Sequence, residues 1–276
     1  MRPSDVLRRA TDYLARHDVE GPRSTAEILL ASVLGTDRAH LYARAEGLTA
    51  AEAGLFGRAL CQRCRGTPLQ HLTGEQPFRR LALAVRPGVF VPRPETEVLV
   101  GAALEALEEV EAPLVVDVGT GTGAIALAVK DERPDAQVIA TDLSAEAAGL
   151  AAHNARALGL DVRVLQGDLL EPVPEELRGW VDLVISNLPY VTPEEYDDLP
   201  EVVRMDPQLA LLGGIEVYER LAAEALRWLV DGGLLAVEIG AAHRDEVLGA
   251  MESSFMEVRV LPDLSGRDRV VLGRRP

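Results

Sequence analysis

The glycine-rich segment Asp117–Gly123 (DVGTGTG) constrains the fold of this 276-residue chain more than any other feature. It follows the apolar run Leu114–Val116, which is typical of a buried strand, and it precedes an apolar helical pattern at 123–131. Glycines at a strand-to-helix turn let the backbone pass close to a ligand and present N–H groups at a helix N-terminus. The segment therefore predicts a βα unit of an open parallel sheet, with a ligand at the end of its strand.

The same alternation of apolar strands and amphipathic helices continues over residues 95–276. We expect a Rossmann-like α/β domain with a mostly parallel, doubly wound sheet and helices on both faces. The expected strands are 114–118, 137–141, 162–166, 181–187, 234–239, 256–261 and 268–273, and the expected helices are 95–110, 123–131, 144–158, 215–229 and 244–252.

Residues 1–74 predict a small helical domain. Ser4 and Ser24 are candidate N-caps, and Thr49 followed by Glu52 is a capping-box signature for a further helix. Residues 75–94 alternate weakly in hydropathy and contain Pro87-Gly88, which favours a hairpin-like linker between the two domains.

Charge is distributed unevenly along the chain. Residues 1–80 hold 12 arginines and 9 acidic residues, a net of +3, whereas the remainder holds 16 basic and 35 acidic residues, a net of −19. Such asymmetry favours two domains with different partners. Only 4% of the chain is aromatic and its catalytic part is acidic, which argues against nucleic-acid binding. No apolar stretch has the length of a membrane span, so we expect a cytoplasmic protein.

The two cysteines do not predict a metal site. Cys61 and Cys64 lie in a helical pattern, with His71 seven residues further on, and a structural zinc ion needs four ligands. We expect two reduced thiols and no metal.

The ends of three expected strands carry acids suited to a nucleoside cofactor. Asp117 would repel a pyrophosphate but can organise the cationic amino end of S-adenosylmethionine. Asp142 can accept both ribose hydroxyls, and Asp168 can accept from an adenine amino group, with Leu169 against the ring. The glycine spacing also fits a nicotinamide-binding fingerprint, which stays an alternative. The expected cofactor-binding residues are Asp117, Gly119, Thr120, Gly121, Thr122, Gly123, Asp142, Asp168, Leu169 and Asn187.

The segment Asn187-Leu188-Pro189-Tyr190 follows the expected strand 181–187. The Asn187 side-chain carbonyl and the Leu188 backbone carbonyl, stiffened by Pro189, are acceptors that suit a planar NH2 group, and Tyr190 can pack against the substrate. These catalytic candidates and the acids indicate a methyltransferase that uses S-adenosylmethionine and acts on an amide or amino nitrogen.

Four segments together resemble the HemK/PrmC family, and the resemblance covers nearly the whole chain. They are FVPRPETE at 90–97, the glycine segment, NLPY at 187–190, and DLSGRDRVV at 263–271. The family consists of N5-glutamine methyltransferases that modify the Gly-Gly-Gln motif of peptide chain release factors. The resemblance implies that the α/β domain is of the class I methyltransferase type. The resemblance implies that the glycine segment and Asp142 bind the cofactor, that residues 187–190 with Phe90 and Arg93 bind the substrate, and that the helical domain helps to hold a release factor.

One departure from the family pattern keeps the substrate open. Leu188 stands where the motif usually has its first proline, and NLPY is also similar to the segment of adenine-N6 rRNA methyltransferases. A ribosomal-protein glutamine methyltransferase is a further alternative. We expect a monomeric enzyme that produces S-adenosylhomocysteine, takes a release factor as partner, and binds neither a membrane nor nucleic acid.

Overall fold

The computed structural model describes residues 2–200 and 203–276 and divides into two compact units. The first comprises the residues up to Glu75 together with the described residues of the segment 200–205. The second comprises Gln76–Leu199 and Asp206–Pro276 and contains the sheet. Throughout the described ranges, none of the helices combines the length and apolar composition that a membrane span requires.

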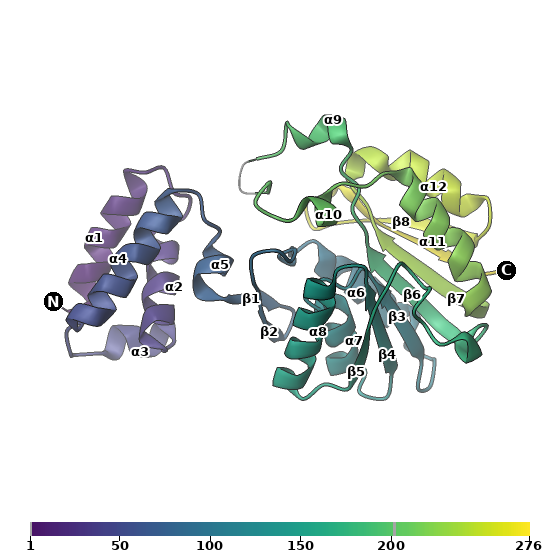
Figure 1. Ribbon diagram of the computed structural model, residues 1–276, viewed down its shortest axis with the longest axis horizontal. Helices are drawn as coiled ribbons and strands as arrows, with labels where there is room; N and C mark the ends of the chain where they lie inside the picture. The colour runs from purple at the N-terminus through teal and green to yellow at the C-terminus, as the bar shows by residue number, and fades with distance from the viewer. Residues whose placement is uncertain (1, 201–202) are drawn as a thin grey trace. The chain divides into compact units, whose positions relative to one another are not determined.

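The first unit is helical, as expected, and its core is lined by apolar side chains such as Leu14, Leu30 and Phe56. Cys61 and Cys64 are free thiols on its fourth helix. The helices, shown in purple and blue in Figure 1, are α1 (Pro3–Ala15), α2 (Pro22–Leu34), α3 (Arg38–Ala43), α4 (Ala50–Cys64) and α5 (Leu69–Thr73).

The helix starts of this unit confirm one predicted cap and correct two others. Thr49 forms the expected capping box, in which its hydroxyl accepts from the Glu52 N–H and the Glu52 carboxylate accepts from the Thr49 N–H. Ser4 and Ser24 are not caps, because Pro3 and Pro22 already occupy the first helical turn. Proline suits that position because its fixed φ is helical and its missing N–H would have no partner there.

The expected hairpin consists of β1 (Glu75–Phe78) and β2 (Leu81–Ala84). Its turn lies at Arg79 rather than at Pro87-Gly88, and Arg79 has a left-handed φ of 50°. The Arg79 side chain forms an ion pair with Glu132, and its backbone N–H donates to Glu97 at 3.0 Å. These contacts fix the turn to the helices of the second unit.

The second unit is built on a seven-stranded sheet with the order β5-β4-β3-β6-β7-β9-β8. Strands β3 to β7 run parallel, and β9 lies antiparallel between β7 and β8. The fold class predicted from the sequence is therefore confirmed. The strands are β3 (Leu114–Val118), β4 (Gln137–Asp142), β5 (Val162–Gln166), β6 (Val181–Asn187), β7 (Leu229–Glu238), β8 (Met256–Pro262) and β9 (Asp268–Arg274).

Helices cover both faces of this sheet, as Figure 1 shows. Helices α6 and α7 pack on one face and α11 and α12 on the other. The helices of this unit are α6 (Thr96–Ala106), α7 (Ala124–Glu132), α8 (Ala145–Leu158), α9 (Pro193–Tyr196), α10 (Gln208–Leu211), α11 (Ile215–Trp228) and α12 (Arg244–Glu252), with short 3-10 turns at Glu175–Leu177 and Ala241–His243.

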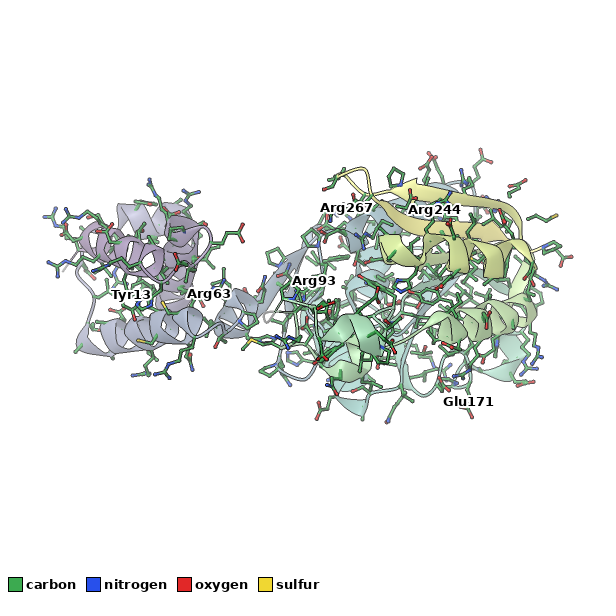
Figure 2. All side chains as sticks on the ribbon, turned by 90° about the horizontal axis from the view of Figure 1, so that it is seen from above. Tyr13, Arg63, Arg93, Glu171, Arg244 and Arg267 are labelled. Carbon is green, nitrogen blue, oxygen red and sulfur yellow. The ribbon has the colours of Figure 1, made fainter. Side chains whose placement is uncertain are left out.

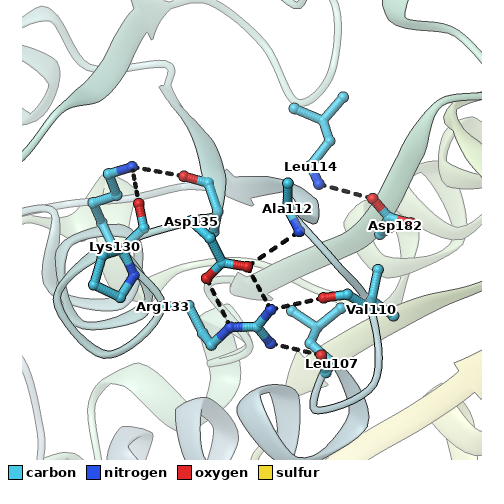
Figure 3. A network of polar contacts seen from close by, with 10 residues as sticks. Leu107, Val110, Ala112, Leu114, Lys130, Arg133, Asp135 and Asp182 are labelled. Atoms are coloured by element: carbon cyan, nitrogen blue, oxygen red, sulfur yellow. Dashed lines mark hydrogen bonds and ion pairs between the residues drawn. The ribbon is translucent and has the colours of Figure 1, made fainter.

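Polar contacts fasten the end of the sheet where β3 and β4 begin (Figure 3). The Arg133 guanidinium donates to the backbone carbonyls of Leu107 at 2.6 Å and Val110 at 2.7 Å, and it pairs with Asp135 at 2.8 Å. Asp135 in turn accepts from the Ala112 N–H at 3.1 Å. These groups satisfy backbone polar atoms of the segment between α6 and β3. They lie at the end of the sheet opposite the C-terminal strand ends, where open α/β sheets bind ligands.

Candidate functional site

Four polar side chains mark the C-terminal ends of four adjacent parallel strands. Asp142 lies on β4, Asp117 on β3, Asn187 on β6 and Glu238 on β7. Strand alternation puts all four on the face that packs against α6 and α7, because each stands at an even spacing from core residues of that face. They therefore form a row along the crevice where open α/β sheets bind ligands.

The glycine segment turns between β3 and α7 in a form that side chains would disturb. Gly119 and Gly123 have φ values of +71° and +86°. A Cβ on Gly123 would lie 2.9 Å from Leu127 Cδ1, and one on Gly119 would lie 3.4 Å from Leu188 Cδ2. The turn thus depends on glycine both for its backbone angles and for its close packing.

Asp142 links the glycine segment to the next helix. Its Oδ2 accepts from the Gly121 N–H at 2.8 Å, and its Oδ1 accepts from the Ser144 N–H at 2.8 Å. Ser144 caps α8 through its own hydroxyl, which accepts from the Ala147 N–H at 3.3 Å. Burial raises the pKa of Asp142. Each carboxylate oxygen retains a further lone pair, so the arrangement is compatible with acceptance of both ribose hydroxyls.

Asp117 is fully buried beneath the glycine segment. Its Oδ2 accepts from the Thr120 hydroxyl at 2.5 Å and from the Ala126 N–H at 3.1 Å. Its Oδ1 is buried without a hydrogen-bond partner among the described residues, and burial raises the pKa of Asp117 to about 7. A buried carboxyl with an unmade bond fits a site that takes a cationic group, such as the amino end of S-adenosylmethionine.

The third acid, Asp168, is half exposed and pairs with Arg220 at 2.7 Å. Its neighbour Leu169 is buried, and the Leu169 carbonyl accepts from the Thr141 hydroxyl at 2.8 Å. The adenine role of Asp168 and Leu169 stays a prediction. Leu143, which follows Asp142 directly, is 55% exposed. It is a further candidate for apolar contact with the adenine ring, and it was not predicted from the sequence.

Asn187 is held by a neighbour on α6. Its Nδ2 donates to the Thr96 hydroxyl at 3.1 Å, which leaves the carbonyl Oδ1 as the acceptor of this side chain. Glu238 is directly opposite Asn187 on the adjacent strand and is 2% exposed. Burial raises the pKa of Glu238 to about 7, while Thr96, Arg269 and Asn187 act in the opposite direction.

The backbone carbonyl of Leu188 is also positioned from within the fold. The buried Tyr218 hydroxyl lies 3.1 Å from the Leu188 oxygen and 2.9 Å from the Glu238 backbone oxygen. A hydroxyl has one hydrogen to donate, so it is shared between these strand-end carbonyls. The Leu188 backbone oxygen keeps a lone pair that can accept from an N–H of a substrate. The Leu188 side chain is buried in the core.

Tyr190 packs where the loop after β6 meets the end of β7. Its ring centroid lies 6.2 Å from that of His243, and a Cβ on Gly240 would lie 2.8 Å from its Cδ2. Burial raises the pKa of Tyr190. The His243 Nε2 lies 3.4 Å from a Glu195 carboxylate oxygen, so both rings are fixed by neighbours.

Phe90 and Arg93 lie together on the segment before α6. The Arg93 guanidinium (Figure 2) stacks over the Phe90 ring at 5.0 Å and forms an ion pair with Asp206. Asp206 also accepts from the Val91 N–H at 3.3 Å, so the segment is fixed to the loop between β6 and α11. Direct contact of Phe90 and Arg93 with substrate stays a prediction.

The segment 263–271 packs against the C-terminal end of β7, next to Glu238. Arg269 pairs with Asp263 at 3.4 Å and donates to the Ile239 carbonyl at 3.1 Å. The Asp263 carboxylate also accepts from the Ser265 and Arg267 N–H groups, so the turn carrying Arg267 (Figure 2) is tied to the strand end beside Glu238.

Pro189 is wedged against Gly213, and this contact yields a test of the loop. A Cβ on Gly213 would lie 2.0 Å from the Pro189 carbonyl oxygen, and the Gly213 N–H donates to the Val191 carbonyl at 3.0 Å. Gly213→Ala must therefore shift Pro189 and the acceptors before it. We expect kcat/KM for methyl transfer to fall about tenfold, because displaced catalytic groups lose their alignment.

The matched control for Gly213→Ala is Gly149→Ala. Gly149 is exposed on α8 and an added Cβ would meet nothing within 4 Å, so this change should leave the rate intact. Equal rates for the wild-type protein and Gly213→Ala would show that the contact with Pro189 does not position the loop.

Within residues 2–200 and 203–276, no cluster of three or more potential metal ligands occurs.

Three residues of the candidate site, Thr96, Tyr218 and Glu238, were not predicted from the sequence. Glu238 carried a signal because it ends an apolar strand just as Asp142 does, and Thr96 lies in the segment 90–97 that carries part of the family resemblance.

Comparison with known families gives two matches that together span most of the chain. The family described as the PrmC N-terminal domain matches residues 5–74. The family described as the methyltransferase small domain matches residues 81–204, which include the glycine segment and NLPY.

Curated relatives match over nearly their full length. A release factor glutamine methyltransferase of Moorella thermoacetica is 44% identical, over 98% of this chain and 97% of the relative. Proteins of the same description from Deinococcus radiodurans and Mycolicibacterium smegmatis are 40% and 42% identical. The alignments cover 100% and 98% of this chain, and 99% and 96% of those relatives.

Solved structures share the fold. A 16S rRNA N2 G1207 methyltransferase of T. thermophilus superposes with a TM-score of 0.55 at 19% identity, over 73% of this chain and 50% of its own. A ribosomal protein L11 methylase of Lactobacillus delbrueckii subsp. bulgaricus gives 0.52 at 22% identity, over 72% and 96%. At these identities the likeness concerns the fold alone.

Proposed function

Since this chain belongs to the family of release factor glutamine methyltransferases, we propose that it transfers a methyl group from S-adenosylmethionine to the side-chain nitrogen N5 of a glutamine. The proposed substrate is the glutamine of the Gly-Gly-Gln motif in peptide chain release factors. The observation that carries this proposal is the pair of carbonyl acceptors, Asn187 Oδ1 and Leu188 O, at the end of β6 and next to the glycine segment.

An amide nitrogen is a weak nucleophile because its lone pair is delocalised into the carbonyl group. Two acceptors at fixed positions counter this weakness. When Asn187 Oδ1 and Leu188 O accept the two N–H bonds of the glutamine amide, they orient the nitrogen and favour the positive charge that develops on it. The methylated, N-protonated amide is a strong acid, so its proton leaves without a dedicated base.

The cofactor supplies an electrophilic methyl group on a sulfonium sulfur. We propose that Asp117 accepts from its ammonium group and that the Asp142 carboxylate accepts from the ribose hydroxyls. Support comes from the unpaired Asp117 Oδ1 and from the Asp142 oxygens, which are fixed by the backbone of the glycine segment and of α8. We propose that Asp168 and Leu169 hold the adenine, and that neither a metal nor a nicotinamide cofactor takes part.

The first unit is proposed to hold the release factor. Residues 1–75 hold 10 arginines and 9 acidic residues, a net of +1, and the remainder holds 18 basic and 35 acidic residues, a net of −17. A negatively charged protein surface would therefore prefer the first unit. We further propose that the enzyme is a cytoplasmic monomer that binds neither a membrane nor nucleic acid.

Labelled S-adenosylmethionine with three acceptors in separate reactions tests the function. The acceptors are an intact release factor, a ribosomal protein mixture, and adenine-containing RNA and DNA oligonucleotides. We expect one methyl group on the release factor, placed by mass spectrometry on the glutamine of Gly-Gly-Gln. Label in ribosomal protein or in an oligonucleotide, with none in the release factor, would replace this proposal by one of the other substrates.

A further inference from the structure

Thr96 is the first residue of α6 and follows the N-cap position, which Glu95 holds. Within the described part of the chain, no side chain caps this helix start. Thr96 is 3% exposed, and its hydroxyl accepts from Asn187 Nδ2 at 3.1 Å instead. The hydroxyl is thus directed at the end of β6 rather than at its own helix.

Glu238 is the third member of this polar cluster, next to Thr96 and Asn187. Its carboxyl lies beside both Thr96 and Asn187, and each lowers the pKa that burial raises. Glu95 and Arg269 are the charged neighbours that also act on it. Glu238 lies directly opposite Asn187 on β7, and its Oε2 is buried without a hydrogen-bond partner among the described residues. In its ionised form this carboxylate can only accept, so acceptance of the Thr96 hydroxyl hydrogen would leave the Thr96 oxygen with lone pairs alone to offer to Asn187.

This direction of donation matters because the amide of Asn187 can turn in two ways. With its NH2 outward it would repel a glutamine NH2, and with its oxygen outward it accepts from one. We infer that Thr96 and Glu238 are positioning residues, which fix the amide of Asn187 so that Oδ1 faces the substrate nitrogen. This inference rests on the proposed function, in which Asn187 Oδ1 accepts from the glutamine amide.

The inference predicts a specific loss in Thr96→Val. Valine keeps the shape of threonine but offers no lone pair to Asn187 Nδ2, so both orientations of the amide become accessible. We expect kcat for methylation of an intact release factor to fall about tenfold, with S-adenosylmethionine affinity within about twofold of wild type. Thr96→Ser retains the hydroxyl and is the matched control, for which kcat should stay within about threefold of wild type.

Glu238→Gln tests the role of the Glu238 carboxyl in orienting the Thr96 hydroxyl. A glutamine can donate to the Thr96 oxygen and so competes with Asn187 Nδ2, and we expect kcat to fall by a similar factor. If both residues act through Asn187, the double variant should be little slower than Thr96→Val alone, since a shared interaction is lost once. All rates are expressed per molecule that binds cofactor. A variant that folds poorly therefore does not distort the comparison between the single and double variants.

Three outcomes separate the possibilities. A wild-type protein that leaves release factor unmethylated overturns the proposed function itself. An active wild-type protein with an equally active Thr96→Val overturns the inference alone. Thr96→Ser as slow as Thr96→Val, or fully additive losses in the double variant, would also overturn it, because packing rather than the hydroxyl would then be responsible.

Discussion

Replacing Asn187 with alanine is expected to slow methylation of a release factor by about 10²–10³-fold, the usual cost of losing one preorganised hydrogen bond to a transition state. The contact of Nδ2 with Thr96 leaves Oδ1 as the acceptor, and alanine has no hydrogen-bonding group in its side chain. The effect should lie in kcat, measured with saturating cofactor and release factor.

Two controls assign this loss to the chemical step. Titration of the Asn187→Ala variant with S-adenosylmethionine should give an affinity close to wild type, because Asp117 and Asp142 lie on other strands. Thermal unfolding should show only a small change, since Asn187 is partly exposed. Half of the wild-type kcat in this variant would remove Asn187 from the proposed amide clamp.

The sheet was predictable because its strands are short apolar runs separated by helix signals. The expected strands 114–118, 162–166 and 181–187 have the observed bounds, and 137–141 differs by one residue. The strand expected at 234–239 begins at Leu229 instead, because Val181 pairs with Leu229 beyond a register shift. Pairing between strands sets that start, and hydropathy along one strand does not record it.

The helical parts show the limits of periodicity. The helix expected over 95–110 ends at Ala106, where a turn continues the chain. The short helices α3, α5, α9 and α10 were missed, because one or two turns give too few positions for a repeating apolar face.

Site residues were predictable where a polar side chain stands at the end of an apolar strand pattern, because the pattern itself places that side chain at the ligand-binding end of the sheet. Asp117, Asp142 and Asn187 stand at the ends of largely apolar runs, and the structure places them in one row. Thr96 could not be found in this way, because its contact with Asn187 joins residues that are distant in sequence and depends on how α6 packs on β6. Tyr218 reaches the Leu188 carbonyl from α11 for the same reason.

The second large effect is expected at Asp117, where stability and cofactor binding should change in opposite directions. Burial raises the pKa of Asp117 to about 7, above the value of about 3.9 for an exposed aspartate. The stability contribution of such a group is fully present below the lower value and is lost as pH rises to the higher one. Asp117→Asn cannot ionise, so the variant without cofactor should unfold at a higher temperature than wild type at about pH 8.

Cofactor affinity should show the reverse, because the proposed ammonium partner needs the ionised carboxylate. Between about pH 5 and pH 7 an α-amino group stays protonated, so wild-type affinity should weaken about tenfold for each pH unit below 7. Asp117→Asn should bind S-adenosylmethionine about 10- to 100-fold more weakly at pH 7, and this pH dependence should be absent. Glu238 has a similarly raised pKa, and its contribution cancels in the difference between wild type and variant.

Calorimetric titration at several pH values, together with thermal unfolding of the unliganded proteins, measures both effects on the same samples. A variant that is more stable and yet binds poorly would mean that Asp117 is kept for its charge at a cost to folding, as is common for residues of functional sites. If Asp117→Asn bound the cofactor as tightly as wild type at pH 7, the carboxyl would have only a structural role, through Thr120 and the Ala126 N–H. The ammonium group would then be held elsewhere along the row of strand ends.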